Sequence, residues 1–93
     1  MTEQKPMIVG GWGPIQPATP EVQDLCNKVL PQIEKMVAMS LHDVRALRFR
    51  HQIVAGSNYR ILAKSGEHYL SVFLFVPLYF VPELTGAEFL PTA

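Results

Sequence analysis

A short turn between two strand-like stretches is the feature of this sequence that most constrains its fold. Residues 44–50 alternate apolar and basic side chains, and residues 59–64 resume a strand-like pattern. A period of two is typical of a strand with one buried face. The residues between the two stretches are small or turn-forming: Ala55, Gly56, Ser57 and Asn58. We therefore predict a β-hairpin with its turn at residues 55–58.

The tip of this predicted hairpin is apolar. Ile53 and Val54 precede the turn, where exposed loops usually carry polar side chains. Apolar side chains gathered at an exposed position are typical of a contact surface. The tip is therefore a candidate site for binding another molecule.

A single helix is predicted from Pro20 to about residue 37. Thr19 fits a helix N-cap, Pro20 the first helical position, and Glu21 an acidic residue in the first turn. Pro31 removes one helical hydrogen bond and predicts a kink. One apolar stripe follows the helical period and is expected to face the sheet: Val22, Leu25, Cys26, Val29, Ile33, Met36 and Val37.

The C-terminal half predicts a second pair of strands. Residues 67–76 are rich in aromatic and branched side chains and predict a central strand. Pro77 ends its pairing because proline has no backbone donor. Residues 78–81 then predict a short return strand before Pro82, and residues 83–93 match no element clearly.

Length and composition fit one small globular domain over residues 1–93. Hydrophobic residues make up 48% of the chain and the formal net charge is zero, which excludes a disordered or strongly basic, nucleic-acid-binding protein. The single cysteine, Cys26, excludes an intramolecular disulfide and suits a reducing compartment. Residues 1–6 are expected to form a mobile tail without a secretory signal, and no run is long enough to span a membrane. We expect a cytoplasmic protein that binds no membrane.

Residues that could carry chemistry are scattered. Cys26 falls on the apolar stripe, where a small buried side chain is expected rather than a nucleophile. The three histidines lack the spacing of metal ligands, so no metal or cofactor is expected. Side chains alternate between the two faces of a strand, so Arg48 and Arg50, two positions apart, should share a face. Arg45 lies three positions before Arg48 and should lie on the other face, so the three arginines are not expected to share one strand face. Neither catalysis nor nucleic-acid binding is indicated.

An apolar segment close to the N-terminus has two interpretations. Residues 7–9 run directly into Gly10 and Gly11, where the backbone can approach another surface closely. The segment is either an ordinary edge strand or an extended trunk that threads a groove. Trp12 is likewise either an interface anchor or a side chain packed across the proline-rich connector of residues 14–17.

Several of these segments together resemble the stefins, the single-domain, disulfide-free and unsecreted branch of the cystatin inhibitors. Gln52-Ile53-Val54-Ala55-Gly56 fits the Gln-x-Val-x-Gly hairpin of the family, and Ser57-Asn58-Tyr59 resembles the Thr-Asn-Tyr that follows it. Residues 7–11 resemble the stefin N-terminal trunk, and residues 17–23 resemble the start of the stefin helix. The resemblance extends from Met7 to about Val76.

The resemblance implies an α+β cystatin fold, in which an antiparallel sheet wraps around one long helix. It also implies reversible, tight and non-covalent inhibition of papain-like cysteine proteases, such as papain and cathepsins B, H, L and S, by a wedge that occludes the active-site cleft. Three elements would form the wedge: the trunk, the hairpin tip and the turn after the central strand. Their residues are Val9, Gly10, Gly11, Gln52, Ile53, Val54, Ala55, Gly56, Val76 and Pro77.

The C-terminal segment, residues 77–93, departs from the stefin pattern. We expect a last strand that is shortened or atypical, because Glu83-Leu84-Thr85-Gly86 fits two different places in the family. The alternative function is a non-inhibitory cystatin-fold interaction or structural protein that self-associates by strand exchange. The inhibitor would act as a monomer, whereas a domain-swapped dimer would bury the hairpin tip.

Overall fold

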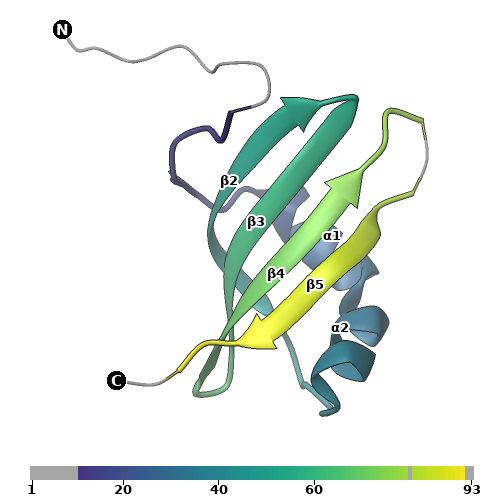
Figure 1. The fold of residues 1–93 in the computed structure, drawn as a ribbon. Coiled ribbons are helices and arrows are strands. Elements are labelled where there is room, and N and C mark those ends of the chain that lie inside the picture. Colours follow the sequence, from purple (N-terminus) through teal and green to yellow (C-terminus); the bar gives the residue numbers. More distant parts are fainter. Residues whose placement is uncertain (1–10, 80, 92–93) are drawn as a thin grey trace, which may run out of the picture.

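The protein forms a five-stranded antiparallel sheet with two consecutive helices on one face (Figure 1). The computed structural model describes residues 11–79 and 81–91. The strands lie in the order in which they occur in the sequence, so each pairs with its neighbour along the chain. The elements are β1 (Gln16–Pro17), α1 (Pro20–Lys28), α2 (Leu30–Val37), β2 (Arg45–Val54), β3 (Gly56–Ser65), β4 (His68–Val76) and β5 (Glu83–Phe89).

The helical segment begins as predicted but consists of two helices. The hydroxyl of Thr19 accepts a hydrogen bond from the backbone N–H of Val22 at 3.2 Å, and Pro20 is the first helical residue. The prediction of one kinked helix is wrong, because α1 ends at Lys28 and α2 begins at Leu30. Pro31 lies in the first turn of α2, where its missing N–H leaves no gap in the hydrogen bonding.

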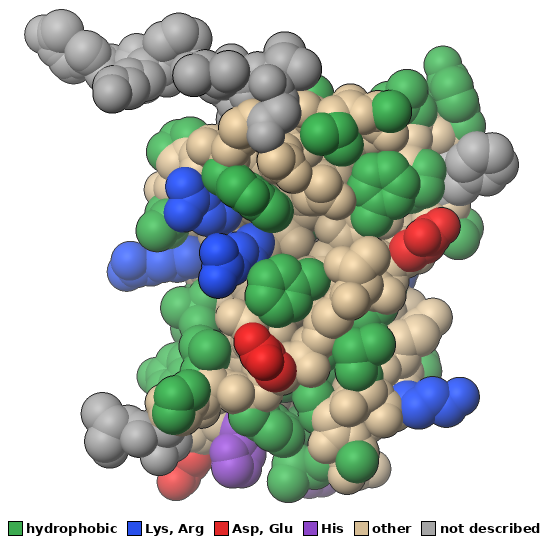
Figure 2. Space-filling model, viewed as in Figure 1, with side chains coloured by type: hydrophobic (Ala, Val, Ile, Leu, Met, Phe, Trp, Pro, Cys, Tyr) green, Lys and Arg blue, Asp and Glu red, His purple; other side chains and the backbone are tan. Residues whose placement is uncertain are grey.

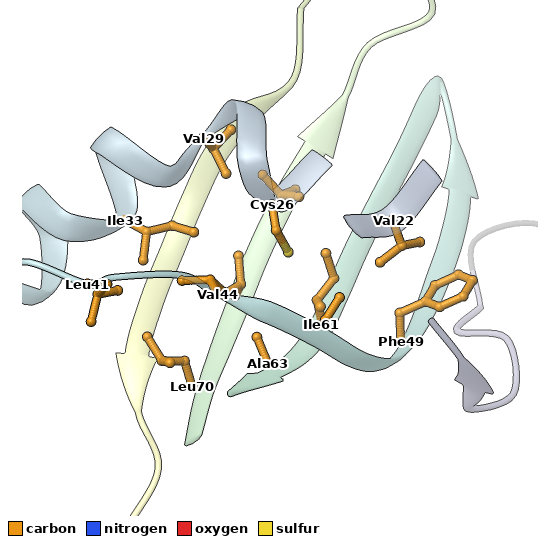
Figure 3. Packing of buried hydrophobic residues seen from close by; sticks show 13 residues of the cluster. Val22, Cys26, Val29, Ile33, Leu41, Val44, Phe49, Ile61, Ala63 and Leu70 are labelled. Atoms are coloured by element: carbon orange, nitrogen blue, oxygen red, sulfur yellow. The ribbon is translucent and has the colours of Figure 1, made fainter. Parts of the chain in front are cut away.

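The core lies between the helices and the inner face of the sheet (Figure 3). Four positions of the predicted stripe are buried in it: Val22, Cys26, Val29 and Ile33. They pack with strand residues that include Phe49, Ile61, Ala63, Leu70, Val72 and Leu74. Met36 does not belong to the core, since half of its surface is exposed. It lies in the last turns of α2, where the stripe reaches the margin of the core.

A β-bulge in β2 changes which side chains share a face. Pairing with β3 shifts between Ala46 and Arg48, so one extra residue, Leu47, stands in β2. Ala46 and Phe49 are therefore both buried although they lie three positions apart. Arg45, Arg48 and Arg50 lie opposite three alternate residues of β3, namely Lys64, Leu62 and Arg60, and therefore all face outward. The prediction that the three arginines do not share one strand face is wrong.

The hairpin of β2 and β3 is tighter than the sequence predicted. The strands pair up to Val54 and Gly56, which leaves Ala55 as the only residue between them. Ser57 and Asn58, predicted as turn residues, belong to β3 instead. Gly56 adopts a φ of 118°, and this conformation allows the reversal to be so short.

The return strand of the second hairpin lies later than predicted. Leu78 and Tyr79 lie in the loop after β4, and β5 begins at Glu83. Pro77 and Pro82 flank this loop and lack the backbone donors that a strand needs. The Glu83-Leu84-Thr85-Gly86 run, which fitted two places in the family pattern, therefore starts the final strand. Leu84, Ala87 and Phe89 pack against the core.

Gln23 joins α1 to the start of β2. Its amide nitrogen donates to the backbone oxygen of Val44 at 2.8 Å, and its amide oxygen accepts from the backbone N–H of Ala46 at 2.8 Å. Glu34 makes a similar connection from α2, because its carboxylate accepts from the backbone N–H of Leu41 at 2.7 Å. These two side chains satisfy the backbone of the helix-to-strand connection, a role that the sequence pattern did not indicate.

Candidate binding edge

One end of the sheet brings together three segments that are distant in the sequence. The turn between β2 and β3, the beginning of the loop after β4 and the first described residues of the chain all lie at this end (Figure 1). We call this end the binding edge and define it by Gly11, Trp12, residues 52–56, Val76 and Pro77. Val9 and Gly10, the other predicted trunk residues, lie outside the described part of the chain.

The hairpin tip packs tightly against the turn after β4. Ser57 pairs with Val76, which places Gly56 beside the end of β4. A β-carbon at Gly56 would stand 2.5 Å from the backbone oxygen of Val76 and 3.1 Å from the α-carbon of Pro77. Only glycine fits this contact without a shift of the backbone. Because residue 56 has no side chain, the hairpin tip and the turn after β4, two of the predicted binding elements, can lie in direct contact.

Side chains close to the tip hold the hairpin in shape. The amide nitrogen of Asn58 donates to the amide oxygen of Gln52 at 2.8 Å across the two strands. On the inner face, the rings of His51 and Tyr59 stack with their centroids 5.5 Å apart, and the ring of Phe49 lies next to both. These cross-strand contacts make the hairpin a preformed element rather than a flexible loop.

The first described residues are attached to β2 beside the tip. Trp12 pairs with Gln52 in an isolated antiparallel bridge, and the backbone N–H of Gly13 donates to the oxygen of His51 at 2.9 Å. Arg50 donates from Nε to the oxygen of Gly13 at 3.0 Å. Gly11 therefore lies next to the hairpin. Trp12 is 42% exposed here, at the edge rather than in the core.

Exposed apolar side chains cover the binding edge and continue beyond it. Ile53 and Val54 are 43% and 41% exposed although they belong to paired strands. Leu78, Tyr79 and Val81 in the following loop are more exposed still. The sequence pattern predicted a strand here instead of an exposed loop, because its apolar and aromatic residues are typical of a buried strand. The flanking prolines were the signal that could have identified it.

Cys26 is poorly placed for catalysis, and the described residues offer no cluster of metal ligands. Cys26 is fully buried, and this burial raises the pKa of its thiol to about 11. A protonated, inaccessible thiol is a poor nucleophile. Among residues 11–79 and 81–91, no group of three potential ligands could hold a metal ion. No helix in this part of the chain is long and apolar enough to cross a membrane.

Comparison with known proteins agrees with this architecture. A family model described as the cystatin domain matches residues 10–77. Cystatin-A of Homo sapiens is 38% identical over 74 residues, which covers 76% of this chain and 76% of that protein. The chain belongs to the cystatin family. The Sus scrofa protein named leukocyte cysteine proteinase inhibitor 1 is also 38% identical to this cystatin, over 77 residues that cover 82% of this chain and 75% of the relative.

A solved structure supports the fold of this cystatin independently. A secreted type 1 cystatin from Fasciola hepatica matches it with a TM-score of 0.72, and the match covers 91% of this chain and 100% of the other. Sequence identity over this match is 23%, so the likeness concerns the fold alone. Together with the likeness to Cystatin-A, it confirms the predicted stefin-type cystatin fold. Membership of a family of inhibitors also confirms the prediction that this cystatin is not an enzyme.

Proposed function

We propose that this cystatin is a reversible, tight-binding and non-covalent inhibitor of papain-like cysteine proteases, and that its binding edge occludes their active-site cleft. The observation that supports this most is the contact of Gly56 with Val76 and Pro77. It joins two separate apolar elements into one projecting surface. The name of the Sus scrofa relative, a cysteine proteinase inhibitor, supports the same target class.

The exposed side chains of the tip can contribute the binding energy. Ile53 and Val54 each retain about two fifths of their surface in the free protein. Burial of apolar surface contributes roughly 25 cal/mol per Å². The paired strands and the Gln52–Asn58 hydrogen bond hold the tip in place before binding, so little conformational entropy is lost on association.

The N-terminal segment would complete the wedge. Gly11 lies beside Gln52 through the bridge made by Trp12, and glycine allows the backbone to approach a protease surface closely. Val9 and Gly10 are assigned to the same trunk from the stefin resemblance. Inhibition then needs no reaction with the protease, because the three elements together exclude the substrate from the cleft.

The proposed partners are papain itself and the related cathepsins B, H, L and S. The inhibitor would act as a monomer, since strand exchange through the hairpin would bury the tip residues in the dimer. The single cysteine fits the reducing environment of the cytoplasm, which we propose as the location.

Non-covalent occlusion can be tested with papain whose catalytic thiol is blocked by a small methylthio group. Occlusion predicts saturable 1:1 binding by calorimetry, together with slower hydrogen exchange at residues 53–56 and 76. Blocked papain that no longer binds, while free papain is inhibited, would show that contact with the nucleophile is required. Protection confined to the helices would place the interface elsewhere.

Self-association is a second candidate function, supported by the exposure of Leu78, Tyr79 and Val81. Three apolar side chains in one loop form a surface that a second copy could cover. Size-exclusion chromatography followed by inhibition assays on each fraction distinguishes the two functions. Inhibition by the monomer fraction supports the first candidate, and a purely dimeric protein without inhibition supports the second.

A further inference from the structure

The charge of this neutral protein is unevenly distributed. Strands β2 and β3 carry five of the eight Lys and Arg residues of the sequence and no Asp or Glu. Because of the bulge at Leu47, the arginines of β2 all lie on the outer face, the side of the sheet away from the helices. Figure 2 views this outer face and shows basic side chains gathered over β2 and β3.

An open hollow of about 400 Å³ lies among these basic side chains. Three of its lining residues are arginines from the two strands, namely Arg48, Arg50 and Arg60. Ser71 of β4 adds a hydroxyl, while Ile15 and Leu62 add apolar walls. The guanidinium groups therefore supply many hydrogen-bond donors to the hollow, and no negatively charged side chain among the described residues lines it.

The strand register places two of these arginines directly opposite each other. Arg50 pairs with Arg60 across β2 and β3, an arrangement in which like charges destabilise a sheet. Within residues 11–79 and 81–91, the only ion pair joins Lys28 and Asp24 on α1, so no carboxylate forms an ion pair with these arginines. Glu88, opposite Ser71 on the neighbouring strand β5, does not line the hollow. An anion bound between the two guanidinium groups would relieve this repulsion.

The guanidinium groups of Arg50 and Arg60 each make a contact that leaves N–H donors available to a ligand. The Nε of Arg50 donates to the oxygen of Gly13 at 3.0 Å, and this contact does not use the two terminal nitrogens. The guanidinium of Arg60 lies 5.5 Å from the ring centroid of Phe73. A fixed, planar guanidinium can bind two oxygens of a phosphate at once.

We propose that this hollow binds a small phosphate monoester with an apolar organic group. The arginines and the Ser71 hydroxyl would hold the phosphate oxygens, and the doubly charged group would relieve the repulsion between Arg50 and Arg60. Ile15, which is 63% exposed, and Leu62 would contact the organic group. This site lies on a different surface from the binding edge and does not depend on the proposed inhibition.

Phenyl phosphate, titrated at constant ionic strength and followed by amide NMR, tests this site. Saturable shifts are expected at Arg48, Arg50, Arg60 and Ser71, with weaker binding of inorganic phosphate and no binding of phenol. Arg60→Gln should weaken binding by about tenfold, the size of one charged hydrogen bond. The matched control is Arg45→Gln, which removes the same charge from the same sheet face but outside the hollow.

Several outcomes would overturn the proposal. Equal weakening by Arg45→Gln and Arg60→Gln would indicate general electrostatic attraction instead of a site. If inorganic phosphate bound as tightly as phenyl phosphate, Ile15 and Leu62 would contribute nothing to binding, and the proposed contact with an organic group would be wrong. Binding of heparin or an oligonucleotide without binding of phenyl phosphate would assign the surface to polyanions. Thermal unfolding of Arg60→Gln checks its fold. Relief of the like-charge pair and loss of the cation–π contact with Phe73 oppose each other, so a stability close to that of the parent is expected.

Discussion

Gly56 and Val76 are in direct backbone contact, and no side chain at residue 56 could be placed between them. The α-carbon of Gly56 faces the carbonyl of Val76 so closely that a β-carbon would lie 2.5 Å from its oxygen. The first residue of β3 and the last residue of β4 thus bring the hairpin tip and the following turn into one surface. The shape of the binding edge depends on this contact.

Gly56→Ala should therefore damage both stability and inhibition. The positive φ of 118° and the clash with Val76 together should cost about 1–3 kcal/mol of unfolding free energy. Displacement of the tip should also raise the inhibition constant for papain. Chemical denaturation and enzyme assays measure the two effects. Gly66→Ala is the control, because Gly66 also has positive φ but nothing lies within 4 Å of its added β-carbon; an equal loss of inhibition there would argue against the contact.

Replacement of Ile53 and Val54 by Asp should abolish tight inhibition and leave the fold intact. About two fifths of each side chain is exposed in the free protein, whereas charges buried in a dry interface cost several kcal/mol, or about two to three orders of magnitude in the inhibition constant. Enzyme assays and circular dichroism measure the two properties. Met39→Asp provides a control at the same 43% exposure as Ile53, remote from the edge. Comparable loss in the control would point to a non-specific charge effect.

Gln23→Ala should lower the free energy of unfolding by about 1–3 kcal/mol, because it leaves backbone groups of Val44 and Ala46 without their partner. Urea denaturation measures the loss. Gln32→Ala changes the same residue type at an exposed position of α2 and should be nearly neutral. Two equally stable variants would show that the amide of Gln23 does not secure the start of β2.

Stability should fall as the pH rises from about 9 to about 11, partly because of Cys26. Burial raises the pKa of its thiol from 9.0 to about 11, so the folded protein holds a proton that the unfolded chain releases in this range. The stabilising contribution is complete below pH 9 and is lost as the pH approaches 11. Denaturation of the parent and of Cys26→Ala across this range measures it. The variant should be less stable at neutral pH and show a shallower decline; parallel curves would contradict the assignment.

Local patterns predicted the elements whose residues follow one uninterrupted period. The start of the helix at Thr19 and Pro20 and the strand that follows the Gly56 turn are of this kind. The faces predicted for the side chains of β2 were wrong because the bulge at Leu47 adds one residue. The bulge is evident only in the folded protein, where Ala46 and Phe49 pack in the same core.

The final strand could not be recognised from local preference. Its sequence, ELTGAEF, is rather polar and contains a glycine, and it becomes a strand because β4 offers hydrogen-bonding partners and α2 covers Leu84. The more apolar residues before it form a loop. For the candidate site, the stefin-like motif supplied the residues that we propose for binding, but the contact between Gly56 and Val76 arises only from the pairing of β3 with β4.

The most direct test of the proposed inhibition is an active-site titration of papain with the purified monomer, followed by hydrolysis of a small fluorogenic substrate. Occlusion by the binding edge predicts a linear, stoichiometric loss of activity that ends at one inhibitor per enzyme, and recovery of activity when the complex is diluted and allowed to dissociate. Full papain activity in the presence of excess folded monomer would contradict the proposal.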